Sequence, residues 1–195
     1  MEYIEEVLTK SKRNNKADIV GSLVAGILFF IMFPSIIVFF KNSKFLGLML
    51  IIGVFLIPGI GFLFGMKLGT KIFNLKKVKF NKTKLYKKLE KAGYLNEFID
   101  TINKEINDIN TIKYYDEFCG SGVLITKTWF VFINILYPEF VRTNDIIEMS
   151  DEISDKSKKF MSLKLKNDEY IRIDHFSVDE IGKEIKKKYP SIKIK

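Results

Sequence analysis

Residues 19–66 form a stretch of 48 residues with only two charged side chains, Lys41 and Lys44. Uncharged runs of 22 residues, residues 19–40 and 45–66, lie on either side of these lysines. A helix of that length reaches roughly 33 Å at about 1.5 Å per residue, enough to cross a bilayer core of about 30 Å. The sequence therefore predicts a membrane protein with a helical hairpin of two transmembrane spans.

The formal net charge of +9 comes from the segment that follows the second run. Residues 67–91 hold ten basic side chains and one acidic one, whereas residues 92–195 hold 16 basic and 18 acidic ones. Cations next to a span mark its cytoplasmic end and are attracted to anionic headgroups. We therefore expect both termini to be cytoplasmic. The candidate headgroup contacts are Lys67, Lys71, Lys76, Lys77 and Lys79.

A nucleic-acid partner is not expected, because a basic footprint for nucleic acid would lie on the folded domain. Phe73, Phe80 and Tyr86 interleave with lysines and could stack on bases. The same pattern suits aromatic residues at a membrane interface beside lysines whose stems lie along apolar surface. The membrane is the favoured interpretation.

Small residues occur at matched depths in the two predicted spans. In a hairpin folded at residues 41–44, Gly21 lies at the level of Gly65 and Ala25 at that of Gly61. Small side chains let two helix backbones approach closely in lipid, although glycine is also commoner in membrane helices generally. Because neither run contains an ionisable residue, and proton or ion pathways usually need one, we expect an anchor and not a transporter.

These patterns divide the chain into four segments: a cytosolic N-terminal segment (1–18), the hairpin (19–66), a basic juxtamembrane connector (67–91) and a cytosolic domain (92–195). Glu2 to Leu8 place apolar residues on one side of a short surface helix. The lone cysteine, Cys119, excludes an internal disulfide.

The last segment predicts an α+β domain. Helical spacing predicts helices over residues 83–92 and 95–108, and a Ser177 capping box predicts a final helix over 178–189 with Gly182 in its middle. Shorter alternating runs between turn residues predict seven strands, over residues 112–118, 123–126, 129–136, 140–143, 146–150, 160–166 and 170–174. An odd-numbered loop at 167–169 would pair Leu165 with Ile171 and Leu163 with Ile173, which keeps the apolar residues on one face.

This order of elements resembles the bacterial pleckstrin-homology-like domains of small membrane-anchored proteins. The features that carry the resemblance are Val123-Leu124-Ile125-Thr126 leading into Trp129-Phe130-Val131-Phe132, the segment Asn144-Asp145-Ile146-Ile147, the hairpin over 161–174 and the helix over 178–189. The resemblance implies an antiparallel β-sandwich or partly open barrel capped by a C-terminal helix, at the membrane of a bacterial cell. The helix over residues 95–108 is extra to the minimal pattern.

No catalytic, cofactor or metal set is predicted. Cys119 and the only histidine, His175, would need to meet in space to form a nucleophilic pair, and Gly120-Ser121-Gly122 is too short for a phosphate loop. An acidic run lacks the ligand spacing of a calcium loop and is interpreted as solvated. That run comprises Asp145, Glu148, Asp151, Glu152 and Asp155.

Two function classes follow from these observations. The first is a membrane-anchored cytosolic binding or scaffolding module that contacts proteins or lipid headgroups. Its headgroup pocket, if it lies on the domain, would form around Lys127, Arg142 and Arg172. The second is an accessory subunit of a membrane transport or signalling complex, in which the hairpin contacts a membrane protein or a second copy of the chain. An enzyme is not expected.

Overall fold

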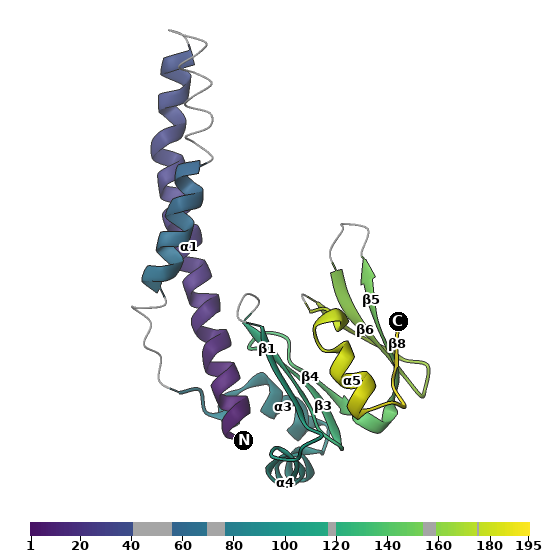
Figure 1. Ribbon diagram of the computed structural model, residues 1–195. Helices are drawn as coiled ribbons and strands as arrows, with labels where there is room; N and C mark the ends of the chain where they lie inside the picture. The colour runs from purple at the N-terminus through teal and green to yellow at the C-terminus, as the bar shows by residue number, and fades with distance from the viewer. Residues whose placement is uncertain (41–55, 70–76, 117–119, 154–158, 175) are drawn as a thin grey trace. The chain divides into compact units, whose positions relative to one another are not determined.

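The computed structural model describes residues 1–40, 56–69, 77–116, 120–153, 159–174 and 176–195. The chain forms two compact units (Figure 1). One unit is helical and consists of Lys12–Lys76; the other is an α+β unit that combines Met1–Ser11 with Lys77–Lys195. The predicted domain boundary at residue 92 thus lies inside the second unit, which also includes the N-terminal residues.

The helical unit contains most of α1 (Glu2–Phe40) and a second helix, Leu56–Gly69. The segment predicted as a short surface helix is the beginning of α1, which continues without a break into the first predicted span. Of the second predicted span, residues 45–55 lie outside the described residues and the remainder is helical. Within the described part of the chain, one helix, Glu2–Ile31, is long and apolar enough to cross a membrane.

The α+β unit contains two four-stranded sheets, in the order β1-β2-β3-β4 and β7-β6-β5-β8. Its strands are β1 (Ile112–Asp116), β2 (Ser121–Ile125), β3 (Trp129–Ile133), β4 (Glu139–Arg142), β5 (Ile146–Ile153), β6 (Lys159–Leu165), β7 (Tyr170–Asp174) and β8 (Lys193–Ile194). Its helical elements besides the start of α1 are η1 (Phe80–Lys82), α3 (Lys84–Lys91), α4 (Leu95–Glu105), η2 (Thr143–Asp145), η3 (Val178–Glu180) and α5 (Gly182–Lys188).

The α+β class is confirmed, but the strand count and the barrel are not. The structure has an eighth strand, β8, which pairs parallel with β5 while all other strand pairs are antiparallel. Two residues are too few to give a period-two pattern, so β8 had no signal in the sequence. Among the described residues the two sheets remain separate, and neither closes into a barrel.

The strands β2 and β3 are buried along their whole length because their sheet is covered on both faces. On one face, Val123 and Phe130 belong to a core shared with the second sheet and α5. On the other face, Leu124 and Trp129 belong to a core shared with helices. Alternate residues therefore enter different cores, which explains why both strands are almost entirely apolar.

The first core joins the two sheets and the C-terminal helix. Met161, Leu163 and Ile173 contribute from the second sheet, and Ile181 and Ile185 from the end of the chain. The predicted final helix is split, because η3 forms first and α5 then begins at Gly182. Gly182 is therefore the first residue of the helix and not in its middle. A Cβ atom on Gly182 would lie 3.4 Å from Cγ2 of Ile194 in β8, so the helix begins close to the second sheet.

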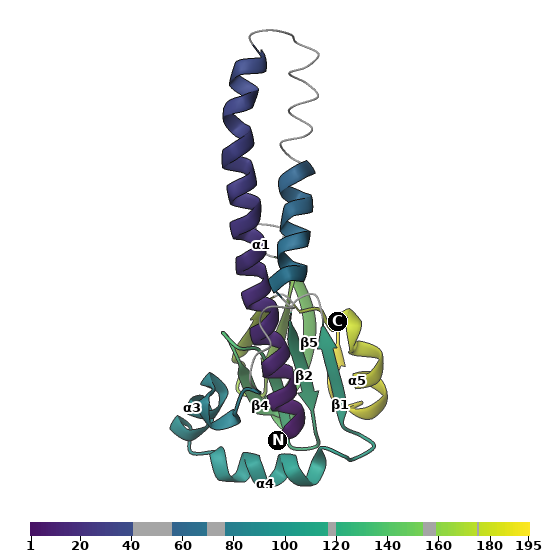
Figure 2. The same cartoon turned by 90° about the vertical axis from the view of Figure 1, so that its left-hand side faces the viewer.

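The second core covers the outer face of the first sheet with helices, as Figure 2 shows for α3, α4 and the start of α1. Ile4, Val7 and Leu8 are at most 2 % exposed in this core. Phe80 contributes from η1, and the buried residues of α3 and α4 complete the layer. The N-terminal residues and the end of the predicted connector are therefore structural parts of the folded unit.

The hairpin of β6 and β7 has the predicted odd-numbered loop but a different register. Leu163 pairs with Ile171, two residues away from the predicted partner. The loop consists of residues 166–168, and Asp168 has a φ of 61°, in the left-handed region that closes three-residue hairpins. The apolar residues still share one face, because a shift of two residues preserves the side-chain alternation.

Two predicted elements end early. The strand predicted over 129–136 stops at Ile133 because the Asn134 side chain accepts hydrogen bonds from the N–H groups of Leu136 (2.8 Å) and Tyr137 (3.2 Å). Such a turn removes these residues from the strand. The helix predicted over 95–108 ends at Glu105.

Candidate functional site

The two described helices of the helical unit approach each other closely at glycines. A Cβ atom on Gly65 would lie 2.9 Å from Cα of Gly21 and 3.2 Å from the carbonyl oxygen of Val20. A Cβ atom on Gly21 would lie 2.9 Å from the carbonyl oxygen of Phe62. Because backbone atoms cannot move aside as a flexible side chain can, these two positions hold only glycine without a shift of the helices.

The pairing of Gly61 with Ala25 stays a prediction. The atoms that lie nearest to a Cβ atom on Gly61 belong to Leu28 and Val24. Val24 and Leu28 are four residues apart and share a helix face, whereas Ala25 is rotated by about 100° from Val24. A third glycine of the second helix, Gly69, also lies close to the first helix, although this contact is not predicted above. A Cβ atom on Gly69 would lie 2.9 Å from Cα of Ala17.

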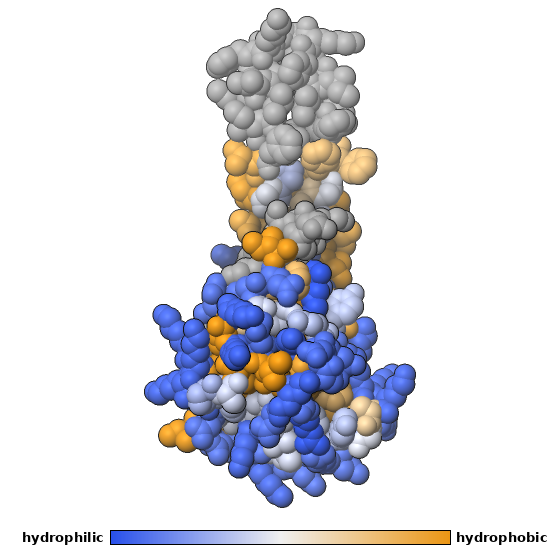
Figure 3. Space-filling view, turned by 90° about the vertical axis from the view of Figure 1, so that its right-hand side faces the viewer, coloured by the Kyte–Doolittle hydropathy of each residue, from blue (hydrophilic) through white to orange (hydrophobic). Residues whose placement is uncertain are grey.

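The described residues of the helical unit expose many apolar side chains, and the orange residues in Figure 3 show part of this surface on one face. The most apolar part of Glu2–Ile31 is only 11 % buried, unlike the core helix of a soluble protein. Large hydrophobic side chains that are more than half exposed are Ile19, Leu23, Ile27, Phe30 and Ile31 of α1 and Leu56, Ile60, Leu63 and Phe64 of the second helix. Contiguous apolar surface of this kind needs a lipid or protein partner.

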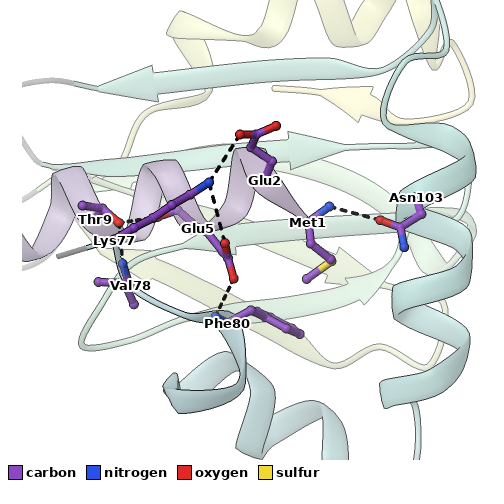
Figure 4. Close-up of polar contacts among 8 residues, drawn as sticks. All are labelled: Met1, Glu2, Glu5, Thr9, Lys77, Val78, Phe80 and Asn103. Carbon is purple, nitrogen blue, oxygen red and sulfur yellow. Dashed lines mark hydrogen bonds and ion pairs between the residues drawn. The ribbon is translucent and has the colours of Figure 1, made fainter.

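Polar contacts hold the start of α1 in the α+β unit (Figure 4). The N–H of Phe80 donates to Oε1 of Glu5 at 2.9 Å, and the N–H of Val78 donates to Oγ1 of Thr9 at 2.8 Å. The ammonium of Met1 donates to Oδ1 of Asn103 at 3.1 Å. The first two bonds satisfy backbone donors that strand or helix pairing does not satisfy.

A tyrosine supports the same attachment from the sheet side. The hydroxyl of Tyr3 donates to the carbonyl oxygen of Tyr114 at 3.0 Å. Burial raises the pKa of Tyr3 far above its usual range, because the charged phenolate would lose its hydration.

The predicted headgroup lysines are placed differently from one another. Lys71 and Lys76 lie outside the described residues. Lys67 is exposed on the helix Leu56–Gly69, and Lys79 is exposed beside η1. Lys77 instead pairs within the folded unit, 3.3 Å from Oε1 of Glu2 and 3.9 Å from Oε2 of Glu5. Lys77 is therefore engaged in protein contacts.

A groove of about 320 Å³ lies between α3 and the loop before β4. Four lysines of α3 line one side, Lys84, Lys87, Lys88 and Lys91. Leu136, Tyr137 and Pro138 line the other side together with Glu139. The lysines follow an i, i+3, i+4, i+7 spacing opposite the buried Leu85 and Leu89, so the helix is basic on one face and apolar on the other.

These four lysines belong to the segment that is predicted as a juxtamembrane connector. Their helical spacing was visible in the sequence and would have placed them on one face of the predicted helix over 83–92. The other side of the groove could not be predicted from the sequence. Tyr137 and Pro138 are about fifty residues away from these lysines, and only the fold brings them to α3.

Of the three residues of the alternative pocket, Lys127 is exposed between β2 and β3, whereas Arg142 and Arg172 lie in different sheets. The guanidinium of Arg142 lies 4.1 Å from the ring centroid of Trp129 and pairs with Glu97, whose pKa this hydrogen bond lowers. In the second sheet, the guanidinium of Arg172 lies 3.7 Å from the ring centroid of Phe160. Both arginines are therefore held by protein contacts.

The remaining chemical candidates do not form a site within the described part of the chain. Cys119, Asp155 and His175 lie outside the described residues. No cluster of three or more histidine, cysteine or carboxylate side chains suited to a metal occurs among the residues that the structure describes. The carboxylate of Asp151 accepts hydrogen bonds from Oγ of Ser177 at 2.7 Å and from the N–H of Val178 at 2.8 Å, which gives it a structural role at the start of η3.

No family model, curated protein or solved structure matches the chain. Function is therefore inferred from the apolar helices and from the groove beside α3.

Proposed function

We propose that the protein is a membrane-anchored binding or scaffolding module, with the α+β unit on the cytoplasmic side of a bacterial cell membrane. The observation that carries this proposal is the exposed apolar surface of the helical unit. Burying that surface in a bilayer removes it from water, and the helices satisfy their own backbone hydrogen bonds, as a membrane requires.

The two-span topology is part of the proposal. Residues 19–40 and 45–66 form the spans, with residues 41–44 on the outer side. The excess of lysines after residue 66 supports this orientation, since cations are retained on the cytoplasmic side. The close contacts of Gly21 with Gly65 and of Ala17 with Gly69 support an antiparallel helix pair.

We also propose that the α+β unit is pleckstrin-homology-like. Support comes from an antiparallel β1-β2-β3-β4 sheet followed by the β5, β6 and β7 strands and a C-terminal helix in the core between the sheets. The helical layer on the outer face and the strand β8 are additions to that pattern.

Membrane extraction tests the anchoring. The protein should stay in the membrane pellet after alkaline carbonate treatment and be released by detergent. Ile27→Arg combined with Ile31→Arg should reduce the retained fraction, because each arginine near a span's middle costs about 3 kcal/mol. The matched pair Ile27→Leu and Ile31→Leu should be retained like the wild-type protein. Release of the wild-type protein by carbonate would contradict the proposal.

A second candidate function is an accessory subunit whose hairpin contacts another membrane helix. Gly26 and Gly59 favour it, because a Cβ atom on either would meet no described atom within 4 Å. Small residues with open space around them let a further helix approach closely. In membranes, cysteine at Gly26 should then form intermolecular disulfides in a homo-oligomer, while cysteine at the enclosed Gly21 should not.

A further inference from the structure

Two cations beside the groove are available for a ligand. The ammonium of Lys84 donates to the carbonyl oxygen of Leu136 at 3.0 Å, and that of Lys88 lies 2.6 Å from Oε1 of Glu139. Among the described residues, Lys87 and Lys91 make no hydrogen bond or ion pair through their side chains. They are four residues apart, so their ammonium groups lie on the same face about one helical turn apart.

The charge of this face selects an anion. Helix α3 carries four lysines and a single acidic side chain, Glu90. The other carboxylate at the groove, Glu139, is already paired with Lys88. A ligand that places negative charge near Lys87 and Lys91 would therefore gain attraction without displacing an existing ion pair.

The apolar wall indicates what kind of anion fits. Leu136 is 42 % exposed and Tyr137 is 73 % exposed, and the ammonium of Lys84 lies 5.7 Å from the Tyr137 ring centroid. An exposed aromatic ring beside lysines is typical of the membrane interface, where the ring lies at headgroup level and the ammonium groups reach phosphate. Free phosphate would use the charges and leave the apolar wall in water.

We propose that the groove beside α3 binds the headgroups of anionic phospholipids, with Lys87 and Lys91 at the phosphates and Tyr137 at the interface. This inference rests on the proposed membrane anchoring and adds the lipid class and the binding residues. Anchoring also favours lipid over an acidic peptide, because a tethered unit meets the headgroups at a high effective concentration.

Fluorescence quenching of a tryptophan introduced at position 137 tests the proposal in the full-length protein. The Tyr137→Trp protein is incorporated into nanodiscs of phosphatidylcholine that contain increasing fractions of brominated phosphatidylglycerol or brominated phosphatidylcholine. Trp129, the only native tryptophan, is 1 % exposed and gives a background that the parent protein measures separately. Brominated phosphatidylglycerol should quench the introduced tryptophan at a lower fraction than brominated phosphatidylcholine.

Charge variants assign the effect to the groove. Lys87→Gln with Lys91→Gln should raise the phosphatidylglycerol fraction for half-maximal quenching more than about fivefold, because the variant removes two cations and each contributes a factor of about five near an anionic surface. The matched control is Lys183→Gln with Lys187→Gln, which removes two exposed lysines at the same spacing from α5 and should leave quenching unchanged. High salt should weaken the selective quenching.

Several outcomes would overturn the proposal. Equal quenching by the two brominated lipids would exclude selection of anionic headgroups. If Lys87→Gln with Lys91→Gln left the selective quenching unchanged, the anionic lipid would bind at a site other than the groove. A glutamate-rich peptide can be added to the protein in phosphatidylcholine nanodiscs. If the peptide shifted the emission of the introduced tryptophan while neither lipid quenched it selectively, the groove would bind an acidic protein segment and not a lipid. Failure of the protein to enter nanodiscs would instead contradict the membrane anchoring.

Discussion

Val7 of α1 lies directly against the backbone of Gly122 in β2. A Cβ atom at residue 122 would come within 2.9 Å of Cγ1 of Val7 and 3.0 Å of the carbonyl oxygen of Tyr114. The N-terminal helix and the first sheet therefore meet at a position where only glycine fits. This contact links residues that precede the first predicted span to the core of the α+β unit.

The Val7–Gly122 contact predicts a measurable coupling. Gly122→Ala should destabilise the α+β unit by about 1–3 kcal/mol, because an added methyl overfills a closed contact. Combining it with Val7→Ala should cost less than the sum of the two single changes, since the smaller side chain makes room. Chemical unfolding of the detergent-solubilised protein measures the double-mutant cycle, and strict additivity would contradict the contact.

Thr9 tests the polar part of the same attachment. Its hydroxyl accepts the N–H of Val78 and donates to the carbonyl oxygen of Glu5 at 2.6 Å. Thr9→Val should lower the free energy of unfolding by about 1 kcal/mol, because the N–H of Val78 loses its acceptor. Thr9→Ser keeps the hydroxyl and should be close to wild type. Equal stability of the two variants would show that the hydrogen bond is unimportant.

The composition of the α+β unit predicts which fragments fold. Residues 92–195 alone lack Phe80, Leu85 and Leu89 as well as the N-terminal residues, and so leave the outer face of the first sheet uncovered. That fragment should bind a hydrophobic dye and aggregate. A chain in which a short Gly/Ser linker replaces residues 12–76 should be soluble and unfold cooperatively. Cooperative unfolding of residues 92–195 alone would contradict the described unit.

The glycine contacts predict which cysteines cross-link in the hairpin. Cysteines at Val24 and Gly61 should form a disulfide more readily than cysteines at Ala25 and Gly61, because Cγ1 of Val24 would lie 3.6 Å from a Cβ atom at residue 61. The side chain end of Leu28, which also borders Gly61, is flexible enough to move aside.

The hairpin also offers a matched pair for disruption. Gly65→Leu should abolish the cross-link between residues 24 and 61, since the leucine would meet the backbone of Gly21. Gly59→Leu adds the same side chain to the same helix, at a position with open space, and should leave the cross-link intact. Equal yields in the two variants would exclude close backbone packing at Gly65.

The elements that the sequence predicted well are those with local signals. The apolar run from Trp129 to Phe132 and the turn at Asn167 and Asp168 identified the β3 strand and the last hairpin, because both depend on neighbouring residues. The odd number of residues in the loop of that hairpin follows from the alternation of apolar and polar residues in its strands. The exact register of the hairpin does not, since Asp168 adopts a left-handed conformation that a sequence does not specify.

The features that sequence reasoning missed depend on partners far away in the chain. Ile4, Val7 and Leu8 have the pattern of a surface helix, and only the outer face of the first sheet explains their burial. The lysines of α3 gain their second wall from residues 136–139. In both cases the sequence shows the pattern of apolar or basic residues, but the residues that pack against them are distant in the chain and are brought close only by the fold.

Cysteine accessibility in intact cells tests the anchored topology most directly. In a Cys119→Ser background, cysteine at Ser43 should react with a membrane-impermeant thiol reagent. Cysteine at Ser191, which is exposed on the α+β unit, should react only after the cells are permeabilised. Labelling of Ser191→Cys in intact cells, with Ser43→Cys labelled only after permeabilisation, would contradict the proposed orientation.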